Sequence, residues 1–469
     1  MAHGADLAQM SYAGWVFPWH GQEYIFSISQ EVSKMEMQQK LSDYINTELD
    51  YWDFSGAIRI TQKGKTLLET YRGCSNLEFG IRNDRNTRFS VASVTKQFTG
   101  FAIMLLYDRG LLQLDERANR YLPPNMQLPT DITIHHLLSH TSGLHNNYNF
   151  EDDFYVEEDR KPYNQEAFFH DWIIREPIGR PGQAFDYNNS NYTLLAWIIE
   201  NVSGQSYSEF LTANIFSRLD MHNTLYDNGL DIIPNRASNY LHDYGVLVRT
   251  PYTNNLFGIG AGGLVTNCDD LQKWYECLRD RRLLSPQAYR IYVTENMNHY
   301  CCGLERYEEN GRVKYAHGGD ILGVSAYTQY FFDEDTCILI LSNTESLNQY
   351  RLGNALAAIL HGEQPQHSRR LDEIFLPPEE LEKYTGIYLP GKIQIEHKNG
   401  KLYLVRINQN IHIELYCVGK HQFKRRFEEQ QYIHTLLSED SAEPSVWGYE
   451  RVKLANSIIA DTNSAIGMI

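Results

Sequence analysis

A nearly continuous apolar run at residues 99–107 places the strongest constraint on how this 469-residue chain can fold. A helix that is hydrophobic on every face has to be buried, so the run predicts the central helix of a folded domain. Ser93 and Lys96 stand just ahead of it and would lie on the first turn of that helix. Residues three apart share a helix face, so the Lys96 amine can reach the Ser93 hydroxyl.

Together these two side chains would make an activated nucleophile. A serine alcohol is nearly inert at neutral pH until a neighbouring base accepts its proton. Burial and the positive end of a helix both disfavour the charged form of a lysine, which frees its amine to act as that base. The backbone N–H of Ser93 would supply one hydrogen bond to a developing oxyanion. An S-x-x-K pattern also occurs by chance, so a capping serine beside a surface lysine stays open as the alternative.

Composition excludes several classes of protein. The net charge of −17 argues against nucleic acid as a partner, because its phosphates would be repelled. The seven cysteines lack C-x-x-C spacing, so we expect no metal site and no disulfide framework, and nothing indicates a cofactor. No run reaches the roughly 18 apolar residues of a membrane span. Residues 1–34 do not resemble a signal peptide, which predicts a cytoplasmic protein, or an exported one if the native start differs. The oligomeric state stays open.

Periodic patterns predict an α+β fold with an antiparallel sheet flanked by helices, followed by a small all-β unit. The expected divisions are an N-terminal extension at 1–35, a catalytic domain at 36–361, a linker at 362–378, a β domain at 379–455 and a tail at 456–469. Alternating apolar residues and the turn signal Asn399-Gly400 predict a meander or barrel for the β domain. The acidic, aromatic segment 146–163 is either a substrate lid or a solvated loop. The glycine-rich segment 258–264 lacks phosphate-loop spacing and predicts close backbone packing.

Two downstream segments could complete a site around the serine and the lysine. Tyr187 precedes a long apolar stretch, and a nearby ammonium would favour its phenolate, making it a usable base. Asn189 could hold Lys96 or the substrate through its amide. Other Y-x-N triplets occur in the chain, so this motif is a weak signal by itself.

The second segment is His317-Gly318-Gly319-Asp320, at the end of a predicted strand. Glycines there let a substrate lie along the strand edge, and the N–H of Asp320 could be the second oxyanion donor. His317 would then face the pocket, although a lone histidine is usually structural.

Taken in order, Ser93-Val94-Thr95-Lys96, Tyr187-Asn188-Asn189 and His317-Gly318-Gly319 resemble the three motifs of the serine β-lactamase and penicillin-binding protein superfamily, in its class C-like branch. Flanking segments similar to the same branch lie at 89–93, 140–144, 194–200 and 261–264. The resemblance covers about residues 36–345 and implies a helical subdomain beside the sheet. The β-rich tail resembles the lipocalin-like domain of some members.

This resemblance implies a serine hydrolase that forms an acyl-enzyme on Ser93. Lys96 and Tyr187 would transfer protons, and Asn189 would position the substrate. His317 would replace the lysine of the third motif, with Gly319 flanking the strand. A mostly neutral histidine, together with the negative charge of Asp320, favours ester, amide or D-residue substrates over penicillins. Acyl transfer, peptide cyclisation by the same acyl-enzyme, and a non-catalytic relative that only binds a peptide-like or small-molecule ligand are the alternatives.

Overall fold

The computed structural model describes residues 21–129, 131–145, 163–173, 177–251, 254–389, 393–406 and 410–427, with strand residues 434–435, 445–446 and 449–452. The helices in these ranges are α1 Gly21–Trp52, α2 Thr95–Asp108, α3 Ile134–Leu138, α4 Gln165–Phe168, α5 Asn189–Ser203, α6 Tyr207–Leu211, α7 Cys268–Arg279, α8 Pro286–Val293, α9 Gln349–Leu360 and α10 Pro378–Leu381. None of these helices is both long enough and apolar enough to cross a lipid bilayer.

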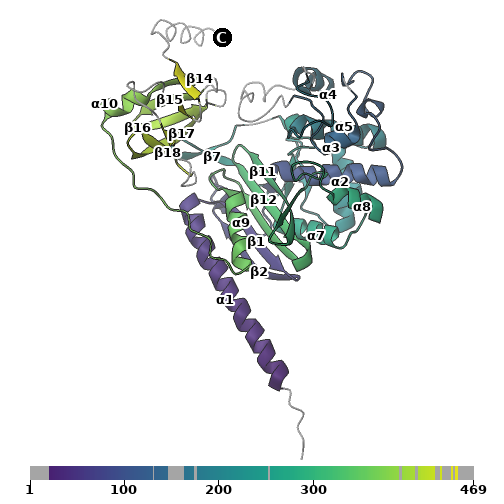
Figure 1. Ribbon diagram of the computed structural model, residues 1–469, viewed down its shortest axis with the longest axis horizontal. Helices are drawn as coiled ribbons and strands as arrows, with labels where there is room; N and C mark the ends of the chain where they lie inside the picture. The colour runs from purple at the N-terminus through teal and green to yellow at the C-terminus, as the bar shows by residue number, and fades with distance from the viewer. Residues whose placement is uncertain are drawn as a thin grey trace, which may run out of the picture.

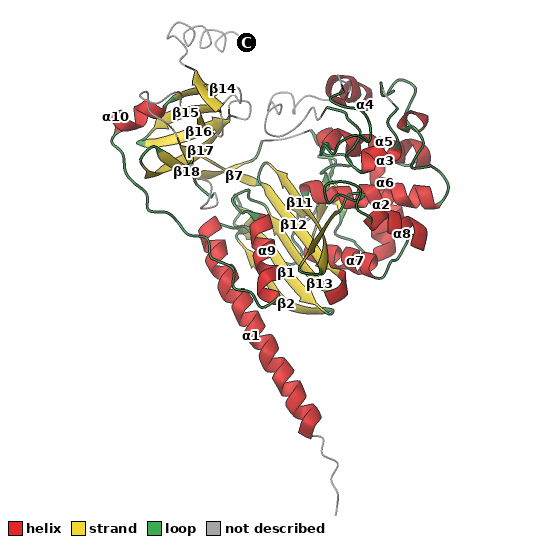
Figure 2. Cartoon of the chain, viewed as in Figure 1, coloured by secondary structure: helices red, strands yellow, loops and turns green. Residues whose placement is uncertain are grey.

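The central sheet is antiparallel and has the strand order β10-β11-β12-β13-β1-β2 in the described part of the chain. Its strands are β1 Gly56–Gln62, β2 Lys65–Arg72, β10 Glu305–Glu309, β11 Arg312–Ile321, β12 Val324–Phe331 and β13 Thr336–Ser342. Side chains alternate across β13, so Ile338 and Ile340 belong to the core cluster with residues of α1 and α9, while Leu339 and Leu341 belong to the cluster with the other helices. Figure 2 shows α1 and α9 on one side of the sheet and the helices around α2 on the other. Both faces of β13 are buried, which explains its nearly continuous apolar sequence.

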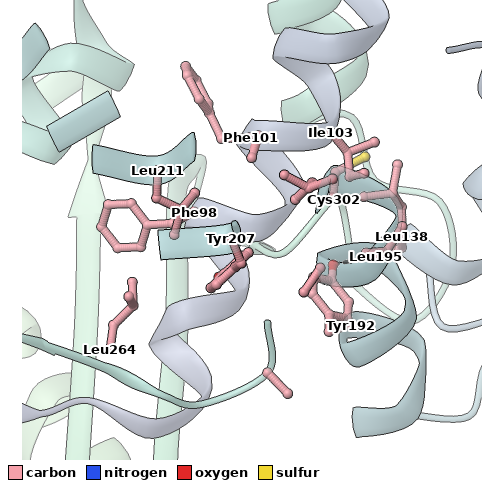
Figure 3. Packing of buried hydrophobic residues seen from close by; sticks show 14 of the residues in the cluster. Phe98, Phe101, Ile103, Leu138, Tyr192, Leu195, Tyr207, Leu211, Leu264 and Cys302 are labelled. Atoms are coloured by element: carbon pink, nitrogen blue, oxygen red, sulfur yellow. Dashed lines mark hydrogen bonds between the residues drawn. The ribbon is translucent and has the colours of Figure 1, made fainter. Parts of the chain in front are cut away.

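Helix α2 is the centre of the helical layer. Every residue from Thr95 to Leu106 is buried, as the apolar run predicted. Figure 3 shows Phe98 and Phe101 of this helix among side chains of α3, α5 and α6, including Leu138, Tyr192, Leu195, Tyr207 and Leu211. Burial on all sides fixes where the start of α2 lies, and therefore where Ser93 and Lys96 lie.

The C-terminal sheet is also antiparallel, with the strand order β19-β18-β17-β16-β15-β14-β21-β20. Its strands are β14 Gly386–Leu389, β15 Ile393–Lys398, β16 Lys401–Arg406, β17 Ile411–Gly419, β18 Gln422–Arg425, β19 His434–Thr435, β20 Ser445–Val446 and β21 Tyr449–Val452. The prediction of an all-β unit is confirmed. The predicted closed barrel is not found among the described strands, because the end strands β19 and β20 each pair on one side only.

The described residues also form three small sheets, from the strands β3 Cys74–Asn76, β4 Ile81–Arg82, β5 Phe89–Ser90, β6 Leu225–Tyr226, β7 Tyr240–Asp243, β8 Val246–Arg249 and β9 Leu264–Thr266. The hairpin β7–β8 lies between the central sheet and the C-terminal sheet (Figure 1).

Three predicted details need correction or fall outside the description. The helical spacing of Leu41, Tyr44, Ile45 and Leu49 predicts a helix only over roughly 36–49, whereas helix α1 begins at Gly21 and its N-terminal end projects away from the rest of the molecule (Figure 1). Ser93 lies on a 3₁₀ turn that precedes α2, not on the first turn of the α-helix itself. The acidic segment 146–163 lies, except for Tyr163, outside the described residues.

Candidate active site

Ser93 lies at the entrance to helix α2, on the 3₁₀ turn Ala92–Val94 that follows strand β5. Ala92 has a φ of 44°, a left-handed conformation that is unfavourable for a residue with a Cβ. Non-glycine residues held in this region cluster at functional sites, where the surrounding structure compensates for their strain. The turn therefore marks Ser93 as a candidate functional residue independently of its sequence motif.

Lys96 is buried and hydrogen-bonds to three oxygen atoms. Its Nζ lies 2.9 Å from Ser93 Oγ, 2.8 Å from Asn189 Oδ1 and 2.9 Å from the carbonyl oxygen of Ala261. Burial lowers the pKa of Lys96 well below its ordinary value of 10.5. A neutral amine has two N–H donors, which the Asn189 and Ala261 oxygens accept, so its lone pair is directed at the Ser93 hydroxyl. Lys96 is thus positioned to accept a proton from Ser93.

Tyr187 lies in the loop before α5 with its ring beside the lysine. The Lys96 Nζ is 4.8 Å from the centroid of that ring. The rings of His140 and His317 flank it, at centroid distances of 4.4 and 6.3 Å. The fold therefore gathers the ring of Tyr187, the amide of Asn189 and the amine of Lys96 in one place.

Strand β11 passes closest to Ser93 at Gly319. A Cβ at Gly319 would lie 2.2 Å from the Val91 carbonyl oxygen and 3.0 Å from the Ser93 nitrogen, so a larger residue does not fit without movement. The next side chain, Asp320, points to the opposite face of the strand. There its carboxylate accepts hydrogen bonds of 2.6 and 2.7 Å from Gln349 of α9. Its negative charge is therefore turned away from Ser93.

His317 is buried beneath the site. Its Nδ1 lies 2.6 Å from the Gly318 carbonyl oxygen, which can only accept, so Nδ1 carries the proton and Nε2 accepts from the Tyr300 hydroxyl at 3.2 Å. Burial and the nearby Lys96 lower the pKa of His317 to about 3. The residue at this motif position is therefore uncharged at neutral pH.

Sequence reasoning missed two parts of this arrangement. The first is the Ala261 carbonyl, which accepts a hydrogen bond from Lys96 although the glycine-rich segment around it predicted only close packing. The second is His140, which is fully buried with a φ of 54°. Its Nδ1 accepts the backbone N–H of Asn188 at 3.1 Å, and its ring packs against Tyr187. His140 thus helps to fix the loop that carries Tyr187, and the only sequence signal for it was its place in segment 140–144.

A cavity of about 320 Å³ opens beside Ser93. Its walls come from the 3₁₀ turn of Ser93, from the first residue of α5, from the glycine-rich segment, from the turn after β11, and from Arg249 at the end of β8. This volume suits a small-molecule or peptide-like ligand. Within the described ranges, no group of three or more His, Cys, Asp or Glu side chains could hold a metal ion. The geometry is that of a hydroxyl nucleophile with a buried base and an adjacent binding cavity.

Comparison with known proteins assigns the family. Residues 45–363 match the family model described as Beta-lactamase. The chain belongs to the beta-lactamase family. Penicillin-binding protein 4* of Bacillus subtilis (strain 168) is 26% identical to it over 443 residues, which cover 87% of this chain and 96% of that protein. The identification that the three motifs indicated is thereby confirmed for the superfamily, whereas the lipocalin-like character of the C-terminal sheet stays a prediction.

Solved structures agree with this assignment. A penicillin binding protein from Bacillus halodurans has a TM-score of 0.58 and 25% identity, covering 67% of this chain and 99% of that one. The D-amino acid amidase of Ochrobactrum anthropi SV3 shares the fold, with a TM-score of 0.57 and 21% identity over 69% of this chain and 96% of that one. This beta-lactamase family member thus shares its fold with a penicillin binding protein and with a D-amino acid amidase.

The close approach of Gly319 to Ser93 gives a first prediction. We expect Gly319→Ala to lower kcat by about 100-fold, because its Cβ would displace the Ser93 N–H from the position of an oxyanion. Gly179→Ala is the matched control, since a Cβ there meets no atom within 4 Å. Steady-state hydrolysis of one p-nitrophenyl ester by both variants checks this. Equal activities would show that the strand at 319 does not constrain the nucleophile.

Proposed function

We propose that this protein is a serine hydrolase that cleaves an ester or amide, in a peptide-like or D-amino-acid-containing substrate, through an acyl-enzyme on Ser93. The observation that carries the proposal is the 2.9 Å hydrogen bond between Ser93 and the buried Lys96, whose pKa is lowered well below 10.5. Burying a lysine costs stability, and such perturbed groups cluster where they serve catalysis. We assign this chemistry to a domain at 36–361, joined through 362–378 to a separate β domain at 379–455.

Acylation follows from the positions of these groups. Lys96 Nζ accepts the proton of Ser93 Oγ while Oγ bonds to the substrate carbonyl carbon. The backbone N–H groups of Ser93 and Asp320 donate hydrogen bonds to the oxyanion that forms. As the bond to the leaving alcohol or amine breaks, Tyr187 donates its phenolic proton to the leaving group and regains a proton from Lys96. The step ends with an ester on Ser93 and a neutral Lys96.

Deacylation reverses these proton movements. Water attacks the ester carbonyl, gives a proton to the pair formed by Lys96 and Tyr187, and the pair returns a proton to Ser93 Oγ as the acid product leaves. An alcohol or amine in place of water would give acyl transfer or peptide cyclisation from the same intermediate. Product analysis with an added amine nucleophile separates these outcomes, because transfer yields a new amide and hydrolysis yields only the acid.

A substrate panel tests the proposed activity. The neutral His317 leads us to expect turnover of p-nitrophenyl esters and D-aminoacyl anilides, with weak or absent turnover of nitrocefin. Absorbance assays on purified full-length protein measure all three classes under the same conditions. A protein that turns over none of them, and that no acylating probe modifies, would instead be a non-catalytic binding relative.

The pH dependence gives a second prediction. Only neutral Lys96 can accept the serine proton, so kcat/KM should rise with pH through the pKa of Lys96 and level off above it. Because burial lowers that pKa, we expect the rising limb to lie well below pH 10.5. Asn189→Asp places a carboxylate on the amine, favours its charged form and should move the limb upward by about one pH unit or more. A limb that stays at the same pH in this variant would mean that another group controls the rate.

A further inference from the structure

The cavity beside Ser93 has an excess of positive charge. The charged side chains in its walls are Asp227, Arg236 and Arg249. Arg236 and Asp227 form an ion pair of 2.6 Å and so neutralise each other. No ion pair to Arg249 occurs among the described residues, which leaves the cavity with one unpaired cation in a chain of net charge −17. An unpaired cation in the wall of a cavity attracts an anionic ligand.

Glu78, whose pKa is affected by the charge of Arg249, does not line the cavity. A hydrogen bond from Tyr240 and, more weakly, the charge of Arg249 lower the pKa of Glu78. The Glu78 carboxylate is exposed and accepts its hydrogen bond from the Tyr240 hydroxyl. It therefore does not occupy the donors of the Arg249 guanidinium, which remain available to a ligand in the cavity.

No cation is available from the third sequence motif. His317 is neutral, with its pKa lowered to about 3, and both of its ring nitrogens already have partners. Burial also disfavours the charged form of Lys96, whose amine is already hydrogen-bonded to Ser93, Asn189 and Ala261. Among the groups described at this site, Arg249 is thus the charged one that can recognise an anion on a substrate bound at Ser93.

Arg249 is the last residue of β8, and the base of its hairpin is fixed to the central sheet. The N–H of Tyr240 donates to the Asn343 carbonyl at 3.0 Å, directly after β13. The N–H of Thr250 donates to the Asn239 carbonyl at 3.0 Å and closes the hairpin. These bonds fix the base of the hairpin, where Arg249 is exposed to solvent and lines the cavity.

The tip of the same hairpin is fixed in the C-terminal sheet. The ring of Tyr244 stacks on His412 of β17 at a centroid distance of 3.9 Å. Lys398 Nζ lies 3.5 Å from the Tyr244 ring centroid, and the Tyr244 hydroxyl donates to Glu396 of β15 at 2.7 Å. A strand rises about 3.3 Å per residue, so this anchor lies within about 17 Å of Arg249 along the hairpin. The C-terminal sheet therefore holds the tip of the hairpin whose last residue, Arg249, lines the cavity. Figure 1 shows β7 between the two sheets.

We infer that Arg249 binds a carboxylate of the substrate, and that the C-terminal sheet keeps Arg249 in position through Tyr244. A planar guanidinium pairs with a carboxylate through two parallel hydrogen bonds, which gives direction as well as charge. The inference rests on the proposed function, because the substrate in question is the one that acylates Ser93. It adds that an ester or amide with a carboxylate is preferred over a neutral one, and that this carboxylate is recognised at the hairpin and not at the third motif.

Two esters of matched length test the binding role of Arg249. The p-nitrophenyl half-ester of adipate carries a terminal carboxylate, and p-nitrophenyl hexanoate carries none. We expect Arg249→Ala to lower the ratio of kcat/KM for the half-ester to that for hexanoate by about 10-fold. Arg249→Lys should restore part of the ratio, and added salt should lower the ratio of the wild type.

The control variant removes a positive charge outside the cavity. Arg218 is exposed and does not line the cavity, so Arg218→Ala should leave the ratio at its wild-type value. Equal ratios in the wild type and Arg249→Ala would overturn the inference while the proposed hydrolase activity stands. If the wild type hydrolyses neither ester, the proposed function fails for these substrates. Calorimetric binding of monomethyl adipate then decides the inference, since equal binding by the wild type and Arg249→Ala overturns it.

The positioning role of Tyr244 is tested by comparing its effects on KM and on kcat. Tyr244→Ala removes the stacking on His412, and we expect it to raise KM for the adipate half-ester by about fivefold, with a much smaller change in kcat. Tyr244→Phe keeps the stacked ring and loses only the hydrogen bond to Glu396, so it should recover most of the wild-type KM. A fall in kcat for both esters without a KM change, or a Phe variant as defective as Ala, would contradict this role.

Discussion

Ser93→Ala should lower kcat/KM by at least about 1,000-fold on every ester or amide that the wild type turns over. The substitution removes the oxygen that would carry the acyl group and leaves the cavity and the backbone donors in place. Residual turnover should therefore come only from binding and from stabilisation of the oxyanion. Initial rates with p-nitrophenyl esters at saturating and limiting substrate measure the loss.

Ser90→Ala is the control for this variant. Ser90 is also buried and lines the same cavity from strand β5, but it makes no contact with Lys96 in the described structure. It should retain turnover within a few-fold of the wild type. If the two variants lose activity equally, the loss reflects damage to this wall of the cavity and not removal of a nucleophile.

Lys96→Met should lower kcat by about 100-fold to 10,000-fold, the range expected for loss of a general base. Methionine preserves the length and burial of the side chain but cannot accept the Ser93 proton. Lys96→Arg should be equally inactive, because a guanidinium stays protonated in proteins. Burst and steady-state kinetics should show that acylation is the slowed step.

Lys314→Met provides the matched control for a buried lysine. Lys314 is 5% exposed, and burial also lowers its pKa, but it bonds to Asn354 and pairs with Glu309 at a distance from Ser93. This variant should keep wild-type kcat even if its thermal stability falls. A Lys96→Met or Lys96→Arg protein with kcat within threefold of the wild type would refute the role of Lys96 as the base.

Local sequence patterns predicted the main elements of the fold. The apolar run at 99–107 predicted the buried helix α2, because a helix that is apolar on every face has to be buried. Closure of the C-terminal sheet depends on pairing between strands distant in sequence, so alternation in each strand could not distinguish an open sheet from a barrel. The start of α1 also escaped prediction, because the apolar period is clear only near its C-terminal end.

The site was predictable where its chemistry is local. Ser93 and Lys96 lie three residues apart, so helical geometry alone predicted their contact, which the structure shows at 2.9 Å. The catalytic roles of these residues, and of Tyr187, remain predictions. Ala261 contributes a backbone carbonyl, which any residue type would offer, so its sequence carries no signal. Arg249 lines the cavity from a hairpin that contacts both the central and the C-terminal sheet, and this placement is a property of the tertiary structure.

Peptide mapping of an acylated protein tests the central claim most directly. Wild-type protein is incubated with a fluorophosphonate or a fluorescent penicillin, its intact mass is measured, and the modified peptide is sequenced by mass spectrometry. The account predicts one adduct, on the oxygen of Ser93, that is absent from Ser93→Ala and forms far more slowly in Lys96→Met. An adduct on any other residue, or an unmodified protein with every acylating probe, would contradict it.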